Sequence, residues 1–289
     1  MHRRRWFHLV SIVAAVAAVL VLFAACGGDE KEEPKSTPAG SATKAAAKAP
    51  ELEDGVLNVG SDIAYAPIEF FEEGTQNPQG LDIDLAKALA DELGVSAEFT
   101  NTGFDGIIGS LETERFDILM SAMTVTEERQ KEIDFIPYFD AGTDILVAEG
   151  NPKNVKSIED LSGLTVGVQI ATIQVDQLQA ANDALKAANK PEINVLTFDQ
   201  NPLAVEQLIN GRADAVIADS PVVANDARLS EGKLEPLGLA VEAAPYGIGV
   251  RKGSSELKAA IEEALQKLIA NGKYKAILIV WGLEGGAID

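Results

Sequence analysis

The sequence predicts an α/β protein of two lobes, each an open and mostly parallel β-sheet flanked by helices. Apolar segments typical of strands alternate with segments of helical periodicity from residue 55 onward, and this alternation runs through two successive series. A chain of 289 residues is long enough to form two separate cores. No sequence unit repeats at a fixed period, which argues against a solenoid. We therefore expect two sheets with a cleft between them.

The first series contains a helix whose leucines recur every four positions. Leu85, Leu89 and Leu93 fall on one face of this helix, and Gly94 provides its C-terminal stop. A later helix begins near Thr126, which we predict to be its N-cap because two acidic residues follow in the first turn. Strands are predicted at residues 56–61, 96–101, 116–121 and 144–149, and helices at residues 80–94, 105–114 and from 126 onward.

The second series repeats the alternation with shorter apolar strands and longer helices. Segments such as LTVGVQ are continuous apolar runs typical of buried parallel strands, and the segments between them have helical spacing. Strands are predicted at residues 164–169, 193–198, 213–219 and 246–252, and helices at residues 172–188, 202–211, 220–229, 254–272 and 274–281.

Charge and rare residues exclude several classes of function. The chain has 24 Lys and Arg against 45 Asp and Glu, a net charge of −21, which argues against binding to a nucleic-acid backbone. Both histidines and the single cysteine lie within the first 26 residues. The remaining body therefore lacks the residues for Ser-His-Asp or Cys-His catalysis and for a Cys/His zinc site. No phosphate-binding glycine loop and no cluster of metal ligands is present in the sequence, so we expect no cofactor and no metal. The sequence gives no sign of oligomerisation, so we expect a monomer.

The N-terminal residues resemble the leader of a bacterial lipoprotein. A basic segment, HRRRWFH, precedes 17 uncharged and mostly apolar residues from Leu9 to Ala25. The following Cys26 and the small residues before it resemble the lipobox, whose cysteine is lipidated. We expect residues 1–25 to be a signal peptide, Cys26 to carry a lipid anchor and residues 26–53 to form a disordered tether. The alternative is a plain membrane anchor, and both interpretations place the body outside the cytoplasm.

Unusual residues follow the predicted strands, where ligands bind in open α/β sheets. Asp62 and Tyr65 come after the first strand, and Asp219 ends a later one. Arg129 lies in the first turn of a helix, where its charge opposes the helix dipole unless a bound carboxylate offsets it. Thr172 stands at another helix start with free backbone N–H groups. An arginine, carboxylates and helix N-termini together form a plausible site for a zwitterion.

Two of these residues also have purely structural interpretations. Arg129 can pair with Glu127, Glu128 or Asp134 on a solvated surface. Asp219 can cap the helix that begins at the next residue. Spacing alone leaves both alternatives open.

Six motifs occur in the following order over roughly residues 55–285: SDIAYAPIEF, GLDIDLAKALADEL, FDGIIGSL, FDILMSAMTVTEERQKEIDFIPYF, LTVGVQIATIQ and GRADAVIAD. Together they resemble the polar amino-acid binding proteins of ABC importers, solute-binding protein family 3. The resemblance implies a two-lobed, periplasmic-binding-protein-like fold of type II. Lobe 1 would comprise residues 54–142 plus 244–289 and lobe 2 residues 143–243, with a hinge of two crossing strands near 142–148 and 240–246.

The resemblance also implies how the two charged ends of an L-amino acid are held. Arg129 would clamp the α-carboxylate, together with backbone N–H groups at Thr124, Thr172 and Ile173. Asp219 would take the α-ammonium group.

Four further residues would surround the rest of the ligand. Tyr65 and Phe104 would sandwich its side chain, and Asp62 would meet the polar end. Ser121 would line the pocket, and the carbonyl of Ala122 would assist with the ammonium group. Ala122 stands where the family often has glycine or serine.

The expected function is therefore capture of an L-amino acid and its delivery to an ABC permease with its ATPase subunit. Asp62 and the acidic body favour a cationic or amide side chain on the ligand. An enzyme similar to cyclohexadienyl dehydratase is the main alternative, and a ligand-sensing module that works through a receptor is the other.

Overall fold

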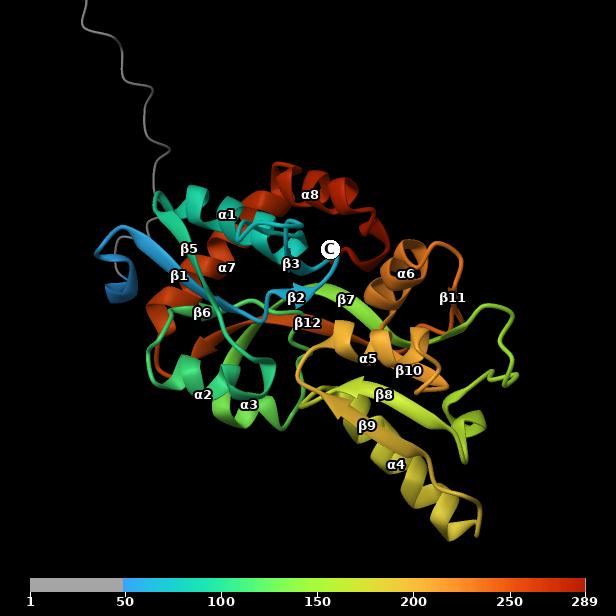
Figure 1. The fold of residues 1–289 in the computed structure, drawn as a ribbon. Coiled ribbons are helices and arrows are strands. Elements are labelled where there is room, and N and C mark those ends of the chain that lie inside the picture. The colour runs from blue at the N-terminus through green and yellow to red at the C-terminus, as the bar shows by residue number, and fades with distance from the viewer. Residues whose placement is uncertain (1–48, 289) are drawn as a thin grey trace, which may run out of the picture. The chain divides into compact units, whose positions relative to one another are not determined.

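The computed structural model describes residues 49–288, and Figure 1 shows their arrangement. The predicted signal peptide, Cys26 and most of the predicted tether lie outside the described residues. Residues 49–53, which the sequence analysis assigned to the tether, contact the folded body: Leu52 is buried and Glu51 forms an ion pair with Arg251 at 3.5 Å. Among the described residues, no helix combines the length and apolar character needed to cross a membrane.

One sheet of nine strands runs through the protein, in the order β5-β1-β6-β12-β7-β10-β8-β9, with β11 beside β7. We call β5, β1, β6, β12 and the start of β7 its first half, and the end of β7 with β10, β8 and β9 its second half. Strands β5, β1 and β6 are parallel to one another, as are β10, β8 and β9. Strands β12 and β7 pair in antiparallel orientation with each other and with their outer neighbours β6 and β10, and so join the halves. The two expected sheets are therefore continuous through these two strands.

The first half contains β1 (Val56–Ser61), β5 (Ser96–Asn101) and β6 (Ile118–Leu119). The bounds of β1 and β5 agree with those predicted. Helix α1 packs against α7 and α8, while α2 packs against β1 and β6 (Figure 1). The helices of this half are α1 (Leu81–Leu93), α2 (Ile107–Glu112), α3 (Arg129–Glu132), α7 (Ser255–Ala270) and α8 (Lys273–Trp281), with 3₁₀ turns at Pro50–Leu52, Phe104–Gly106 and Glu284–Gly286.

In the second half, helices also pack against the strands: α4 and α5 both contact β8 (Figure 1). Its predicted elements all occur, with boundaries shifted by at most two residues. The strands are β8 (Thr165–Gln169), β9 (Asn194–Phe198), β10 (Ala215–Asp219) and β11 (Leu234–Pro236), and the helices are α4 (Ile173–Ala187), α5 (Asn201–Ile209) and α6 (Ser220–Leu229), with a 3₁₀ turn at Ile158–Leu161.

Strands β7 (Ile133–Ala148) and β12 (Val241–Arg251) connect the two halves. β7 pairs with β12 over its first part and with β10 from Thr143 onward. The register between β7 and β12 shifts between Val241 and Ala244, close to this exchange of partners. Gly142 allows the two strands to approach there, because a Cβ atom would lie 2.6 Å from the Ala240 carbonyl oxygen. The crossing strands are longer than the segments predicted from the sequence.

A second, three-stranded sheet was not predicted. It consists of β2 (Ala64–Tyr65), β3 (Glu69–Phe71) and β4 (Pro78–Gln79) in antiparallel order. This small sheet places Tyr65 and Glu69 opposite each other, directly after the first strand of the large sheet.

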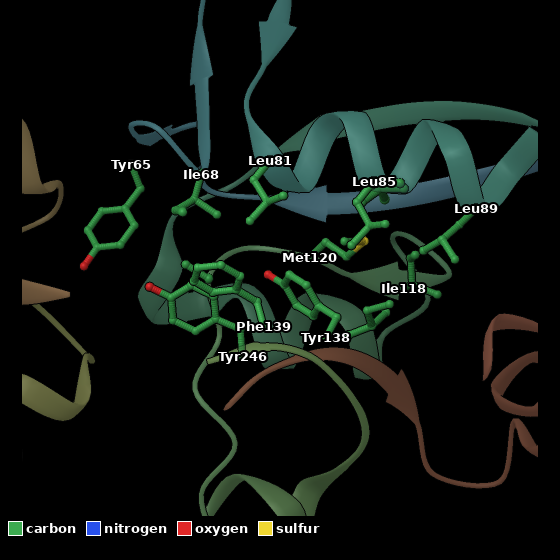
Figure 2. Close-up of a cluster of buried hydrophobic side chains, with 14 of the residues drawn as sticks. Tyr65, Ile68, Leu81, Leu85, Leu89, Ile118, Met120, Tyr138, Phe139 and Tyr246 are labelled. Atoms are coloured by element: carbon green, nitrogen blue, oxygen red, sulfur yellow. The ribbon is translucent and has the colours of Figure 1, made fainter. Parts of the chain in front are cut away.

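The core of the first half lies between α1 and the large sheet. Figure 2 shows Leu85 and Leu89 projecting from α1 toward Ile118 of β6. Aromatic rings from the connecting strands complete this cluster: the ring centroids of Phe139 and Tyr246 lie 5.5 Å apart. The predicted i, i+4 leucine pattern therefore corresponds to the buried face of α1.

Gly60 in β1 is required by close packing. A Cβ atom at this position would lie 2.2 Å from the Phe116 ring. We expect Gly60→Ala to lower the free energy of unfolding by roughly 1–3 kcal/mol, because this overpacking must displace the ring. Urea unfolding measures the change. Gly109→Ala is the control: it lies inside α2 with open space around it, and there alanine should stabilise by up to about 1 kcal/mol. An unchanged midpoint for Gly60→Ala would contradict this account.

Candidate functional site

Residues from both halves of the large sheet surround one cavity, near the carboxyl ends of β1, β8 and β10. All ten residues singled out from the sequence line it, together with three that were not. The predicted residues are Asp62, Tyr65, Phe104, Ser121, Ala122, Thr124, Arg129, Thr172, Ile173 and Asp219, and the additional ones are Glu69, Gln169 and Gln174.

Arg129 is the first residue of α3, and its guanidinium group points into the cavity rather than to solvent. Its Nη1 donates to the Thr124 carbonyl at 2.7 Å and its Nη2 to the Ala171 carbonyl at 3.0 Å. The group also lies over the Phe104 ring, 5.5 Å from the centroid. Burial lowers the pKa of Arg129, an effect opposed by the negative charge of Asp219. Within residues 49–288 no ion pair joins Arg129 to the acidic neighbours considered above.

Thr126 was predicted to be the N-cap, but α3 begins at Arg129 and Glu128 holds the N-cap position. The Thr126 hydroxyl oxygen accepts the backbone N–H of Arg129 at 3.2 Å, three residues along the chain. The observed helix is shorter than expected, because the chain turns into β7 at Ile133.

Asp219 ends β10 and stands at the N-cap position of α6, but its side chain makes no capping hydrogen bond. Its carboxylate oxygens accept instead from the Gln174 amide at 2.8 Å and from the Tyr65 hydroxyl at 3.1 Å. The side chain is buried, and this burial raises the pKa of Asp219. The structure therefore directs the carboxylate into the cavity, and the capping interpretation of its side chain was wrong.

Asp62 also borders the cavity, next to Ser121, and is buried. Its backbone N–H donates to the Ser121 hydroxyl at 2.9 Å, and its Oδ2 accepts from the Gln169 amide at 2.8 Å. Burial raises the pKa of Asp62 to about 6, although the bond from Gln169 favours the charged form.

Glu69 brings a second carboxyl group to the same side. Its Oε1 accepts from the Ser121 hydroxyl at 3.0 Å, whereas the buried Oε2 has no hydrogen-bond partner among the described residues. Burial, with a further contribution from the charge of Asp82, raises the pKa of Glu69 well above its usual value. An unpaired buried oxygen that borders a cavity is available to a ligand.

Two alanines in the cavity region have left-handed backbone conformations, with φ of 46° at Ala122 and 62° at Ala171. The glycine that the family often has at the position of Ala122 agrees with this geometry, because glycine adopts positive φ freely. The Ala122 N–H donates to Asp82 at 3.0 Å. Thr172 precedes α4, and its hydroxyl donates to the Gln169 carbonyl at 2.8 Å.

Polar contacts within the cavity connect the two halves of the sheet. Gln169 bonds to Asp62, Tyr65 bonds to Asp219 and Arg129 bonds to Ala171. With these side chains in place, about 10 Å³ of free volume remains, roughly the room needed by one water molecule. Binding of an amino acid therefore requires these contacts to open. Among the described residues, no group of three His, Cys, Asp or Glu side chains could hold a metal ion.

The three additional residues differ in how well the sequence marks them. Gln169 ends β8, so it occupies the same kind of strand-exit position as Asp62 and Asp219 and could have been found by that rule. Gln174 lies in the first turn of α4 without any distinctive signal. Glu69 is a charged residue between Ile68 and Phe70, and a charge inside an apolar run is a detectable signal of a buried polar function.

A model of the bacterial extracellular solute-binding proteins, family 3, matches residues 57–284. The chain belongs to this family. The resemblance carried by the six sequence motifs is thereby confirmed. The fold expected for a family 3 solute-binding protein, α/β with two lobes, also agrees with solved structures of amino-acid-binding proteins.

Several known proteins are similar to this family 3 solute-binding protein. The arginine-binding protein ArgT of Corynebacterium glutamicum is 35% identical over 81% of this chain and 77% of its own length. An ancestral arginine-binding protein bound to glutamine has a TM-score of 0.72 and 38% identity, covering 78% of this chain and 97% of that one. The ancestral amino acid-binding protein AncCDT-1, a precursor of cyclohexadienyl dehydratase, has a TM-score of 0.72 and 39% identity, covering 80% and 96%.

Proposed function

We propose that this protein is an extracytoplasmic lipoprotein that binds an L-amino acid with a cationic side chain and delivers it to an ABC importer. One observation carries the proposal: a half-buried guanidinium group, Arg129, and a buried carboxylate, Asp219, border the same small cavity. The names of the relatives, which include an arginine-binding protein, support an amino-acid ligand.

The two charged groups suit the two ends of an amino acid. The Arg129 fork matches a carboxylate in bidentate geometry, and its present partners are two neutral carbonyl groups that a carboxylate would replace favourably. Asp219 accepts only from neutral donors, so an ammonium group would be its first cationic partner among the contacts described. Backbone N–H groups at the start of α4 add positive potential beside the carboxylate.

The side-chain end of the cavity favours positive charge. Asp62 and Glu69 both lie there, and burial raises the pKa of each carboxyl group. A guanidinium or ammonium group on the ligand would offset that burial and give the free Oε2 of Glu69 a donor. An amide side chain satisfies the hydrogen bonds without the charge, whereas an acidic side chain would add repulsion.

Delivery requires the ligand to stabilise a closed conformation. We assign residues 54–142 plus 244–289 to lobe 1 and residues 143–243 to lobe 2, with bending at the crossing of β7 and β12. A ligand that touches Arg129 in one lobe and Asp219 in the other stabilises closure by its differential affinity for the closed state. The lipobox-like residues before Cys26 support anchoring of the protein to a membrane near its importer, and we propose that it acts as a monomer.

A melting experiment tests the ligand class. The full-length protein is purified in mild detergent, unfolded and refolded to remove carried ligand, and its Tm is measured with each of the twenty L-amino acids. A ligand at 100 times its Kd should stabilise the fold by about 2.7 kcal/mol. A selective increase with arginine, lysine or histidine supports the proposal, whereas no increase with any amino acid would refute it.

The affinity for a cationic amino acid should fall in acid. Because the pKa of Asp62 is about 6, its carboxylate is mostly charged at pH 7 and mostly protonated at pH 5. A cation favours the charged form, so we expect the Kd for L-arginine to increase about tenfold from pH 7 to pH 5. Isothermal titration calorimetry measures this change. The Asp62→Asn variant should bind more weakly at pH 7 with a flatter pH profile, and a pH-independent wild-type Kd would contradict the role of Asp62.

An enzymatic function remains the second candidate because of one site feature and one structural relative. The buried Glu69 carboxyl group, whose pKa is raised, can hold a proton for acid catalysis. AncCDT-1 is described as a precursor of cyclohexadienyl dehydratase. Turnover of prephenate or arogenate by the purified protein would favour this candidate, and absence of turnover with tight amino-acid binding would favour the binding protein.

A further inference from the structure

Asp82 is a fully buried carboxylate in the first turn of α1. Its Oδ2 accepts the backbone N–H of Ala122 at 3.0 Å, and its Oδ1 accepts the Tyr138 hydroxyl at 2.6 Å. Figure 2 shows the Tyr138 ring below α1, on the side of the helix that faces the core. Among the described residues, those that line the cavity do not include Asp82; it meets the site through its hydrogen bond with Ala122 and through its charge, which acts on Glu69.

Ala122 has a backbone conformation that L-residues with a Cβ atom disfavour, with φ of 46°. The Asp82 carboxylate meets the N–H group of this residue, so the bond holds the peptide in place. On the other side of the turn, the Met123 carbonyl accepts the Gly247 N–H at 2.9 Å. The short segment from residue 121 to 124 is thus fastened at one end to α1 and at the other to β12.

This segment supplies groups to both ends of the cavity. The Ser121 hydroxyl accepts from the Asp62 N–H and donates to Glu69, at the end proposed for the ligand side chain. The Thr124 carbonyl accepts from Arg129, at the end proposed for the α-carboxylate. A rotation of the Ala122 peptide would therefore move groups at both ends together.

We propose that Asp82 is a positioning residue for the ligand site: it holds the Ala122 peptide in its left-handed conformation and thereby sets the position of residues 121–124. This inference rests on the proposed function wherever it is tested by the binding of a ligand. A carboxylate suits the role because it has two acceptor oxygens and receives one donor on each. An asparagine can keep both bonds, since its oxygen can accept the Ala122 N–H while its amide donates to the Tyr138 hydroxyl oxygen.

Two substitutions of Asp82 distinguish its role in positioning the Ala122 peptide from an effect of its negative charge. We expect Asp82→Ala to weaken L-arginine binding by roughly 10- to 100-fold, the range for loss of a hydrogen bond to a charged group. Asp82→Asn should bind within about threefold of the wild type. Asp84→Ala is the control on the same helix, because Asp84 accepts from the Trp281 indole at 3.0 Å and makes no hydrogen bond to residues 121–124 within the described part of the chain. It should leave the Kd within about threefold.

A double-mutant cycle tests the route through Ala122. Glycine adopts positive φ without the steric penalty, so in an Ala122→Gly background Asp82→Ala should cost at least about threefold less affinity than in the wild-type background. Calorimetric titration of the full-length protein with L-arginine measures all four corners. Equal losses in both backgrounds, or a loss in Asp82→Asn as large as in Asp82→Ala, would overturn the inference.

Hydrogen exchange of the ligand-free protein distinguishes failure of this inference from failure of the proposed function. If the wild type does not bind L-arginine, the cationic ligand is wrong, but the Ala122 amide still reports on Asp82. That amide should exchange at least about tenfold faster in Asp82→Ala and at the wild-type rate in Asp82→Asn. An exchange rate unaffected by Asp82→Ala would overturn the positioning role whatever the ligand is.

Discussion

Replacement of Arg129 by alanine is expected to abolish amino-acid binding while the fold remains intact. Removal of one partner from a buried, hydrogen-bonded charge pair costs about 2–5 kcal/mol, or roughly 30-fold to several thousand-fold in Kd. The proposed carboxylate would lose its only guanidinium partner among the residues that line the cavity. The fold should persist because Arg129 donates only to two carbonyl groups near the cavity edge. Calorimetry with L-arginine measures the affinity, and circular dichroism measures the fold.

Arg228→Ala is the matched control for this variant. Arg228 is an exposed arginine on α6 whose guanidinium group donates to Asn225 at 2.8 Å, outside the cavity. It should leave the Kd unchanged. If Arg129→Ala keeps micromolar affinity for the same amino acid, the role of Arg129 as the carboxylate clamp is wrong.

Asp219→Asn is expected to have an effect of similar size. The substitution preserves the shape of the side chain and removes the negative charge that the α-ammonium group would meet. Because Asp219 is buried, its loss should cost about 2–5 kcal/mol of binding free energy. The amide oxygen of asparagine can keep the bond from Gln174, and its NH2 group can donate to the Tyr65 hydroxyl oxygen, so Tm without ligand should change little. Titration with L-arginine at pH 7 provides the measurement.

Asp226→Asn tests whether any charge change on α6 has this effect. Asp226 lies on the same helix, and burial raises its pKa to about 7, but its partner is Asn201 at 2.9 Å rather than a group that lines the cavity. Wild-type affinity is expected for this variant. Wild-type affinity in Asp219→Asn as well would exclude Asp219 as the ammonium partner.

Local pattern predicted the elements whose neighbours in the sheet are also near in sequence. Strand β1 is a short and mostly apolar segment, whereas β5 largely alternates polar with apolar residues, and both were placed at their observed bounds. The start of β7 was missed, since Pro137, Asp140 and Gly142 there resemble a loop. These residues form a strand because β12, about a hundred residues later, pairs with them. The strands of the small sheet were missed because two or three residues are too few to show a period.

In the site too, some residues could be found from their local sequence, whereas others depend on contacts between distant parts of the chain. Strand-exit positions led to Asp62 and Asp219, and the structure places both at the cavity. Asp82 could not be found in this way, because it lies on the first turn of a helix where an acidic residue is ordinary. Its relevance depends on the contact with Ala122, forty residues along the chain, which only the fold creates.

The position of β12 in the sheet has a consequence for the order in which this chain can fold. β12 separates β6 from β7, yet among the described residues it is the last strand to be synthesised, followed by α7, α8 and the 3₁₀ turn at Glu284–Gly286. By contrast, β7, β10, β8 and β9 are all present by residue 219. The second half can therefore assemble on a growing chain, while the first half holds an unfilled position between two strands until residue 251 is available. Completion of the ligand site thus waits for the C-terminal part of the chain, and contacts so distant in sequence form slowly.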